Sequence, residues 1–256
     1  MKNLFKKSLT EKPGVVGWLM IPSAFSAEVM AQCGWDALTV DLQHGIQDYQ
    51  SMVSCFQAMQ AHPVTPLVRV PANEPGIIGK VLDAGAHGVI CPLVNTAQEA
   101  ESFVSHCLYP PKGKRSNGPI RAGIYGMTAD YQKTANDEIL TIPMIETVEA
   151  VNNLEAILDV PGVNSILIGP TDLALSMGMA PTMDTEDRKI LDVYQFIVDQ
   201  STKRGITVGL YVGSAAYCLK MIKMGFHWCA ISCDSGLLSA ASNQQLMEVR
   251  SGLKKS

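Results

Sequence analysis

Two short stretches decide the fold: Ile142-Pro143-Met144-Ile145-Glu146-Thr147 and Ile166-Leu167-Ile168-Gly169-Pro170-Thr171-Asp172. Each is an apolar run that ends in a carboxylate and is followed by an amphipathic segment. Such runs, separated by a helix-length segment, predict neighbouring buried strands that run parallel. Glu146 and Asp172 then lie together at the carboxyl ends of these strands, where α/β proteins place their active sites. Paired carboxylates there indicate either a cation site or an acid/base pair.

The same strand–helix unit recurs along the chain, which predicts a (β/α)₈ TIM barrel that forms one domain over residues 1–256. The expected strands cover residues 15–20, 37–41, 66–70, 88–91, 140–145, 165–168, 206–211 and 228–232. The expected helices cover residues 23–33, 48–61, 75–84, 96–107, 128–136, 147–158, 172–175, 184–204, 214–224 and 237–253. An irregular, Pro- and Gly-rich loop at about 109–126 interrupts the pattern. A doubly wound open sheet is the alternative, but no Gly-x-Gly-x-x-Gly follows the first strand.

Composition narrows the class of protein. The chain has 256 residues, 47% of them hydrophobic, and a net charge of −4 without a long basic run, so we expect no nucleic-acid partner. No apolar stretch approaches the roughly 18 residues of a membrane helix, and no signal peptide is expected. The 7 cysteines form no Cys-x-x-Cys pair, which indicates a reduced, cytoplasmic setting.

Polar residues gather at the expected carboxyl ends of the strands. The second strand supplies Asp41 and His44, the third Arg69, the fifth Glu146 and the sixth Asp172. In a barrel all of these ends open on one face. The sequence therefore predicts a single site built from five polar side chains.

These residue types suit the enolisation of a 2-oxo acid. Two carboxylates with open positions bind Mg²⁺ or Mn²⁺, and a guanidinium can hold a developing oxyanion. In Asp41-x-x-His44, the histidine is a candidate general base whose tautomer the carboxylate fixes. The stretch Gly169-Pro170-Thr171-Asp172 opens a helix, so its backbone N–H groups can receive a substrate carboxylate.

Taken singly, each residue also has a structural explanation. Arg69 could pair with a structural acid, Asp41 could cap the following turn, and His44 could be a surface residue. Glu146 and Asp172 could pair with basic residues instead of binding an ion. Their convergence at one rim favours a functional site. By contrast, the positions of the other histidines suggest no chemistry: His62 and His106 should face solvent, and His87 and His227 precede strands at the opposite end of the barrel.

Five ordered motifs resemble the HpcH/HpaI aldolase family of metal-dependent class II pyruvate aldolases. The motifs are Val40-Asp41-Leu42-Gln43-His44-Gly45, Leu67-Val68-Arg69, Tyr109-Pro110-Pro111-x-Gly113-x-Arg115, Met144-Ile145-Glu146-Thr147 and Gly169-Pro170-Thr171-Asp172-Leu173. The resemblance runs nearly end to end. It implies a barrel of the phosphoenolpyruvate/pyruvate type, usually assembled as a homohexamer (a trimer of dimers). It also implies reversible cleavage of a 4-hydroxy-2-oxo acid to pyruvate and an aldehyde.

The resemblance also implies roles for individual residues. Glu146 and Asp172 would bind Mg²⁺, Mn²⁺ or Co²⁺, and His44 would act as the base through a metal-bound water. Arg69 would hold the C2 oxygen of the enolate. Asp83, in Leu82-Asp83-Ala84-Gly85, matches the acid that raises the basicity of that histidine. The pyruvate carboxylate would be bound by backbone N–H at Thr171, beside Gly169 and Pro170.

The chain departs from the family pattern at several positions, which keeps a second activity open. Gln43 stands where the family commonly has Glu, Met144 where the type aldolase has Gln, and Ser116-Asn117-Gly118 replaces a more glycine-rich turn. Another carbon–carbon lyase or synthase, acting on citrate-like, oxaloacetate or acyl-CoA substrates, is the alternative. A binding protein without catalysis is the third possibility. No lysine stands at the strand ends considered above, which argues against a Schiff-base mechanism.

Overall fold

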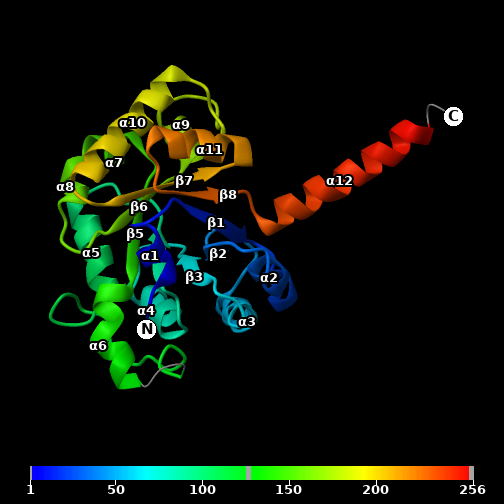
Figure 1. The fold of residues 1–256 in the computed structure, drawn as a ribbon. Helices are drawn as coiled ribbons and strands as arrows, with labels where there is room; N and C mark the ends of the chain where they lie inside the picture. The colour runs from blue at the N-terminus through cyan, green and yellow to red at the C-terminus, as the bar shows by residue number, and fades with distance from the viewer. Residues whose placement is uncertain (1, 125–127, 254–256) are drawn as a thin grey trace.

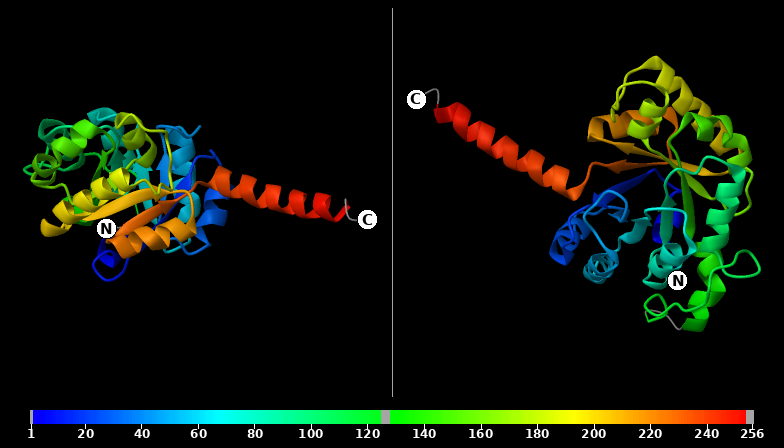
Figure 2. Two further views of the ribbon diagram at one scale, coloured as in Figure 1. Left: turned by 90° about the horizontal axis from the view of Figure 1, so that it is seen from above. Right: turned by 180° about the vertical axis from the view of Figure 1, so that it is seen from behind.

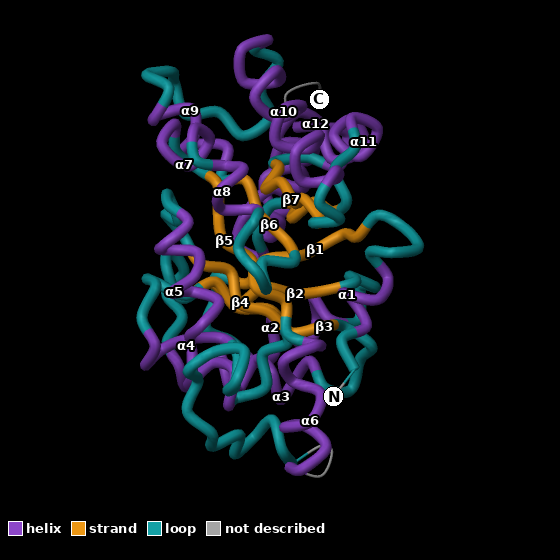
Figure 3. The backbone as a smooth tube through the Cα atoms, turned by 90° about the vertical axis from the view of Figure 1, so that its left-hand side faces the viewer, coloured by secondary structure: helices purple, strands orange, loops and turns teal. Residues whose placement is uncertain are grey.

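Eight parallel strands close into a barrel in a computed structural model that describes residues 2–124 and 128–253. Each strand pairs with its neighbour in the sequence, and β1 closes the barrel against β8 (Figures 1 and 3). The strands are β1 (Gly14–Leu19), β2 (Ala37–Asp41), β3 (Thr65–Arg69), β4 (Gly88–Cys91), β5 (Leu140–Ile145), β6 (Ser165–Ile168), β7 (Thr207–Val212) and β8 (Trp228–Ile231). The predicted (β/α)₈ barrel is therefore confirmed, with strand ends displaced by no more than about one residue.

The helices surround the barrel and connect its strands. They are α2 (Ala24–Ala31), α3 (Tyr49–Met59), α4 (Pro75–Asp83), α5 (Ala97–Cys107), α6 (Thr128–Glu138), α7 (Val148–Asn152), α8 (Leu154–Leu158), α9 (Pro170–Ser176), α10 (Arg188–Lys203) and α11 (Ala215–Met224). Side-chain caps begin many of them; Asp48 and Thr96, for example, form capping boxes at α3 and α5.

Two expected helices differ from those observed. The helix expected over residues 147–158 is divided into α7 and α8 at Asn153, whose backbone leaves the helical region. The helix expected from residue 184 begins at Arg188 instead. Asp184 is engaged elsewhere, because its carboxylate accepts hydrogen bonds from the Gly213 backbone N–H and the Ser214 hydroxyl. The Asn153 side chain likewise donates to the Asn95 carbonyl at 2.9 Å, so both differences coincide with side chains that bond to distant backbone, which sequence periodicity does not report.

A short helix at the start of the chain closes the amino-terminal end of the barrel. This helix, α1 (Leu4–Ser8), was not expected from the sequence. Its Phe5 is fully buried, donates its backbone N–H to the Thr65 hydroxyl and meets the Trp228 ring edge-on at 5.9 Å. This contact fills the amino-terminal end of the barrel interior with apolar side chains.

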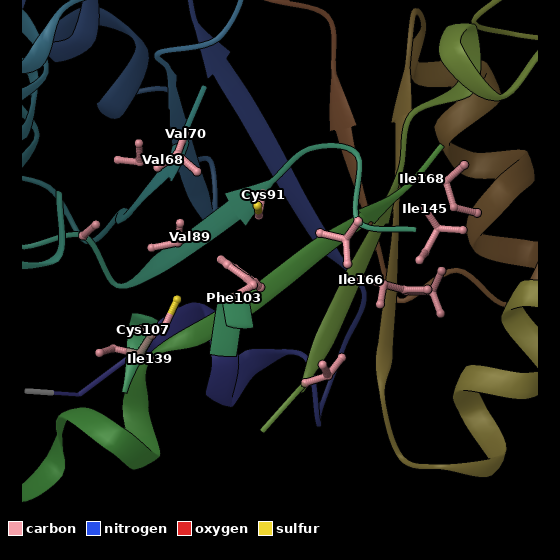
Figure 4. Packing of buried hydrophobic residues seen from close by; sticks show 14 of the residues in the cluster. Val68, Val70, Val89, Cys91, Phe103, Cys107, Ile139, Ile145, Ile166 and Ile168 are labelled. Atoms are coloured by element: carbon pink, nitrogen blue, oxygen red, sulfur yellow. The ribbon is translucent and has the colours of Figure 1, made fainter. Parts of the chain in front are cut away.

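The core has two layers. Inward-facing side chains fill the barrel, and a larger cluster packs between the strands and the helices. Figure 4 shows part of the outer layer, which includes side chains of β3 to β6 and Phe103 and Cys107 of α5. The largely apolar strands leave few buried positions for charge, so a buried carboxylate in this fold has a specific partner or function.

The long loop was expected at about 109–126. Residues 109–124 contain neither helix nor strand, as expected, and residues 125–127 lie outside the described residues. Arg115 fixes the loop by donating hydrogen bonds to the Tyr131 hydroxyl at 3.1 Å and to the Asp83 carboxylate at 2.6 Å. The loop is therefore bound to α4 and α6.

The last helix, α12 (Asp234–Leu253), extends away from the barrel (Figures 1 and 2). Only its first residue is buried: the Asp234 carboxylate accepts hydrogen bonds from the backbone N–H groups of Met20 and Ile21. Beyond this attachment, Leu238 and Leu246 are 63% and 51% exposed. Among the described helices, none has the length and apolar character that a membrane crossing requires.

Candidate active site

A cavity of about 230 Å³ opens at the carboxyl end of the barrel. It is lined by Trp18, Met20, Asp41, His44, Arg69, Met144, Leu167, Gly169, Pro170, Thr171, Asp172, Met183 and Tyr211. Four of the five polar residues expected at the strand ends lie in this lining, and Glu146, the fifth, lies directly behind Gly169. The structure thus brings the five residues together.

Asp41 and Arg69 form a fixed ion pair at the floor of the cavity. Paired register between β2 and β3 sets the two residues side by side. Arg69 Nε donates to Asp41 Oδ1 at 3.0 Å and Nη2 donates to Oδ2, which makes the contact bidentate. Burial acts against the charged carboxylate, but Arg69 and the Trp18 indole together hold the pKa of Asp41 below its ordinary value. Arg69 is thereby held in one orientation, with its guanidinium 5.1 Å from the Trp18 ring centre.

The expectation that Asp41 fixes the tautomer of His44 stays a prediction, because the hydrogen bonds of Asp41 in the described residues go to other groups. In the described structure the Asp41 carboxylate accepts from Arg69, from the Trp18 indole N–H and from the backbone N–H groups of Gln43 and His44. Its oxygens accept from a guanidinium, an indole and the backbone of a turn. Asp41 therefore orients Arg69 and the backbone that carries His44.

Glu146 is a buried carboxylate held at the end of β5. It is 3% exposed, and its Oε1 accepts the backbone N–H of Leu93 at 2.8 Å. Burial raises the pKa of Glu146, the Leu93 bond opposes this effect, and the negative charge of Asp172 adds to it. Gly169 leaves the necessary room, since a Cβ at this position would overlap the Glu146 carboxylate. A buried carboxylate next to the negative charge of Asp172 indicates a place for a cation.

The turn into α9 forms one wall of the cavity. Gly169 precedes the helix, Pro170 is its first residue, and Thr171 and Asp172 follow in the first turn. The first turn of a helix leaves N–H groups without intrahelical acceptors. Those of Thr171 and Asp172 are therefore available beside the Asp172 carboxylate.

Asp83, which the family resemblance pairs with His44, does not line this cavity within one chain. It ends α4, at the opposite end of the barrel from His44, and binds Arg115 at 2.6 Å. The lining of the active-site cavity does not include it. Any contact between Asp83 and His44 requires two copies of the chain.

Sequence patterns missed three residues that shape the site. Trp18 and Tyr211, from β1 and β7, line the cavity and meet edge-on with ring centres 5.2 Å apart. Their apolar strands gave no sign that these side chains face a cavity. Leu93 has a left-handed backbone (φ 54°), uncommon for a non-glycine residue, which directs its N–H to Glu146. No residue-type pattern reports such a conformation.

The donors present suit a hard divalent cation with an open coordination sphere. Glu146 and Asp172 offer carboxylate oxygens, and no group of three or more His, Cys, Asp or Glu side chains in the described residues could enclose a metal. Mg²⁺ typically binds through one or two carboxylates and keeps several positions for water and substrate. Zinc, which prefers a fuller set of nitrogen and sulfur ligands, suits this pair poorly.

The sequence of this chain is similar to a known family and to characterised relatives over most of its length. The HpcH/HpaI aldolase/citrate lyase family model matches residues 15–241. The hydroxypyruvate/pyruvate aldolase of Rhizorhabdus wittichii is 36% identical over 240 residues, which cover 93% of this chain and 95% of that protein. The 4-hydroxy-2-oxo-heptane-1,7-dioate aldolase of Salmonella newport is 33% identical, covering 100% and 97%.

The fold comparison agrees with the sequence comparison. A solved structure of an HpcH/HpaI aldolase/citrate lyase family protein from Burkholderia cenocepacia superposes with a TM-score of 0.91 at 31% identity. The match covers 97% of this chain and 100% of that one. From the family match, the near full-length similarity and the shared barrel, it follows that this chain belongs to the HpcH/HpaI aldolase/citrate lyase family.

Proposed function

We propose that this protein is a metal-dependent class II aldolase that reversibly cleaves a 4-hydroxy-2-oxo acid to pyruvate and an aldehyde. One observation carries the proposal: Arg69, fixed by Asp41, faces the same cavity as Asp172, with the Glu146 carboxylate directly behind it. This arrangement combines a cation site with an oxyanion holder, as enolisation of a 2-oxo acid requires. The aldolase names of the relatives support this carbon–carbon lyase chemistry.

The residues divide the work of binding and polarising pyruvate. A divalent ion (Mg²⁺, Mn²⁺ or Co²⁺) held by Glu146 and Asp172 would supply a Lewis acid at the 2-oxo group. The Arg69 guanidinium stabilises negative charge at the C2 oxygen. The N–H groups of Thr171 and Asp172 bind the substrate carboxylate beside Gly169 and Pro170. These contacts hold the C3–C4 bond toward the open mouth of the cavity.

His44 is the proposed general base. It lies in the cavity lining, on the turn that Asp41 fixes through the His44 backbone N–H at 3.2 Å. In the cleavage direction it takes the proton of the C4 hydroxyl, and in the other direction it takes a proton from C3 of pyruvate. A base on a fixed turn keeps its distance to substrate constant, which is what proton transfer needs.

We propose that the protein works as a homo-oligomer, as a hexamer built from dimers. The exposed apolar side chains of α12, including Leu238, Leu246 and Val249, need a covering surface. Phe25 of α2 and Leu219 of α11 are 72% and 62% exposed and flank the side of the barrel where an eighth helix would pack. A second copy provides that cover, and further contacts between copies would allow Asp83 of one chain to approach His44 of another.

The cytoplasm is the proposed location. All 7 cysteines are free, and five of them are buried among apolar side chains. Free thiols persist in reducing compartments.

The test is a cleavage assay with 4-hydroxy-2-oxo acids of different chain length, in which released pyruvate is measured enzymatically. We expect activity that EDTA abolishes and that added Mg²⁺, Mn²⁺ or Co²⁺ restores. Borohydride in the presence of pyruvate should label no lysine. Labelling together with EDTA-resistant activity would show a Schiff-base aldolase instead.

The second candidate is a lyase or synthase of the same family that acts on citrate-like, oxaloacetate or acyl-CoA substrates. It is favoured by Met144, whose thioether places an apolar group in the cavity lining, 2% exposed, where the type aldolase has a polar residue. The same assay with oxaloacetate and acyl-CoA donors distinguishes the two. Faster turnover of these donors than of any 4-hydroxy-2-oxo acid would select the second candidate.

A further inference from the structure

A second cavity lies at the amino-terminal end of the barrel, away from the proposed active site. Its volume is about 300 Å³. It is lined by Lys2, Phe56, Met59, Gln60, His62, Val64, Pro66, Gly85, His87, Arg121, Ala122 and Tyr131. These residues come from the start of the chain, the carboxyl end of α3, the turns before β3 and β4, the long loop and α6. Nothing in the aldolase chemistry uses this cavity.

The polar part of the lining is basic. Lys2 and Arg121 supply its positive charge, and no Asp or Glu is among the lining residues that the structure describes. This is unusual in a chain whose net charge is −4. A concave surface lined by one sign of charge concentrates ligands of the opposite sign. The cavity therefore favours an anion.

Arg121 is held in a defined position at the edge of the cavity. Its Nη1 donates to the Ala84 carbonyl at 2.7 Å and its Nη2 to the Gln60 side-chain oxygen at 3.2 Å. Its backbone N–H donates to the Asp83 carbonyl at 3.1 Å. A guanidinium fixed in this way loses little conformational entropy when it binds a ligand.

His87 provides a buried polar atom that needs a partner. Its backbone is fixed from both sides, by the Pro66 carbonyl at 2.8 Å and the Leu140 N–H at 2.9 Å. Its ring Nδ1 is buried and has no hydrogen-bond partner within the described part of the chain. Among the described buried polar atoms without a partner, this one belongs to a residue that lines the cavity, which makes the His87 ring a candidate contact for a ligand. Burial also lowers the pKa of His87 to about 4, so near neutral pH the ring carries a single N–H that can donate.

The opposite wall is apolar. Phe56 and Met59 of α3 are 2% exposed, Tyr131 is 1% exposed, and the Tyr131 hydroxyl is already engaged by Arg115 and the Leu82 carbonyl. A few polar groups facing an apolar wall are typical of small-molecule sites. The wall offers a hydrated phosphate ion no partner, whereas it covers an aromatic or branched carbon skeleton.

We propose that this cavity binds a small organic carboxylate with an apolar body, with the carboxylate toward His87 and Arg121 and the carbon skeleton against Phe56, Met59 and Tyr131. Within one chain the site shares no lining residue with the aldolase cavity, so its test does not depend on the proposed reaction.

Benzoate is a suitable probe, with inorganic phosphate as the anion that lacks an apolar body. Calorimetric titration of the full-length protein should show benzoate binding at one site per chain, and phosphate binding at least 10-fold weaker. The variants His87→Phe and Arg121→Met should each weaken benzoate binding at least 10-fold. His106→Phe, on α5 outside the cavity, and His44→Ala, in the other cavity, should leave it unchanged.

Near-ultraviolet circular dichroism of each variant shows that loss of binding is not loss of folding, and having two cavity variants keeps the test open if one fails to fold. Three results would overturn the proposal: no benzoate binding, binding unchanged in both folded cavity variants, or phosphate binding as tight as benzoate. Loss of benzoate binding in His44→Ala alone would place the probe in the aldolase cavity and also contradict the proposal.

Discussion

At the scale of single residues, the site depends on how its charges are held. Asp41 is fully buried and Arg69 nearly so, and each supplies the other's counter-charge. Both residues could be identified in the sequence from their place at strand ends, where Asp41 was expected to act on His44. Residue spacing shows which side chains share a rim, yet it does not show which pairs form, because that depends on strand register and on neighbours such as Trp18.

The first prediction concerns the bidentate Arg69–Asp41 contact. Arg69→Lys keeps the charge but loses the planar pair of donors, so we expect kcat to fall about 10²- to 10³-fold, the usual effect of losing an oxyanion-stabilising donor. Arg204→Lys is the matched control, because Arg204 pairs with Glu155 and Asp159 at the surface. Steady-state kinetics measure both. Equal activity of the two variants would remove Arg69 from the proposed mechanism.

The second prediction uses the lowered pKa of His87. The folded pKa of about 4 lies below the ordinary value of 6.5, so the unfolded chain takes up this proton first as the pH falls. The stability that the neutral ring contributes is complete above about pH 6.5 and is lost between about pH 6.5 and 4. At about 1.4 kcal/mol per pKa unit, this loss amounts to about 3 kcal/mol.

Urea unfolding at about pH 7 and pH 4 measures this loss at fixed protein concentration. His87→Gln cannot titrate, so its stability should fall by about 3 kcal/mol less than that of the wild type over the same range. Identical pH dependence in the two proteins would show that His87 is not buried as a neutral ring.

At the scale of elements, apolar runs and the capping, Gly and Pro residues at their ends predicted the strands and most helices. This worked because each parallel strand is buried on both faces, so that most of its residues are apolar, and because caps such as Thr96 mark helix starts. The sequence analysis missed α1, which is only 5 residues long and is stabilised by Phe5 entering the barrel. It also missed the left-handed Leu93, whose conformation depends on its bond to Glu146. Both depend on contacts with distant parts of the chain.

The third prediction concerns the turn that joins β6 to α9. Gly169→Ala should displace the Glu146 carboxylate, because the added methyl group would overlap it. We expect a loss of stability of about 1–3 kcal/mol from overpacking and Mn²⁺ binding weaker by about 10- to 100-fold. Calorimetric Mn²⁺ titration and urea unfolding measure these two quantities.

Gly79→Ala serves as the control substitution. Its added Cβ meets no atom within 4 Å, and Ala in the middle of α4 should stabilise the helix by about 0.5–1 kcal/mol without changing Mn²⁺ binding. If Gly169→Ala bound Mn²⁺ as tightly as the wild type, Glu146 would not be a ligand at this turn.

At the scale of the whole molecule, the protein is a closed barrel with one helix that leaves it. The sequence predicted a helix near this position but not its direction, because a helix with apolar residues packs equally well on its own barrel or on another. Two features set the direction of α12. The Asp234 carboxylate accepts hydrogen bonds from the backbone N–H groups of Met20 and Ile21, just after β1, and Ser232 has a left-handed backbone (φ 52°). Family, fold and aldolase class were predicted correctly from the motifs, whereas the oligomer remains a prediction.

The fourth prediction tests the role of α12 in assembly. Leu246→Glu places a charge in the apolar stripe of the helix and should convert the oligomer to smaller species. Gln244→Glu adds the same charge on another face and should leave the wild-type mass, about 166 kDa for six copies of the 27.6 kDa chain. Sedimentation equilibrium measures the mass. A wild-type protein that sediments as a monomer would refute the proposed assembly directly.

The central claim is that this cavity forms the enolate of pyruvate with the help of a divalent metal and His44. Its most direct test follows the loss of the pyruvate methyl proton signal in D₂O, with Mg²⁺, Mn²⁺, Co²⁺ or EDTA, for wild type and His44→Ala. The account predicts rapid exchange with metal, none with EDTA, and a large loss in the variant. Exchange that is equally fast with EDTA or without His44, or no exchange with any metal, would contradict it.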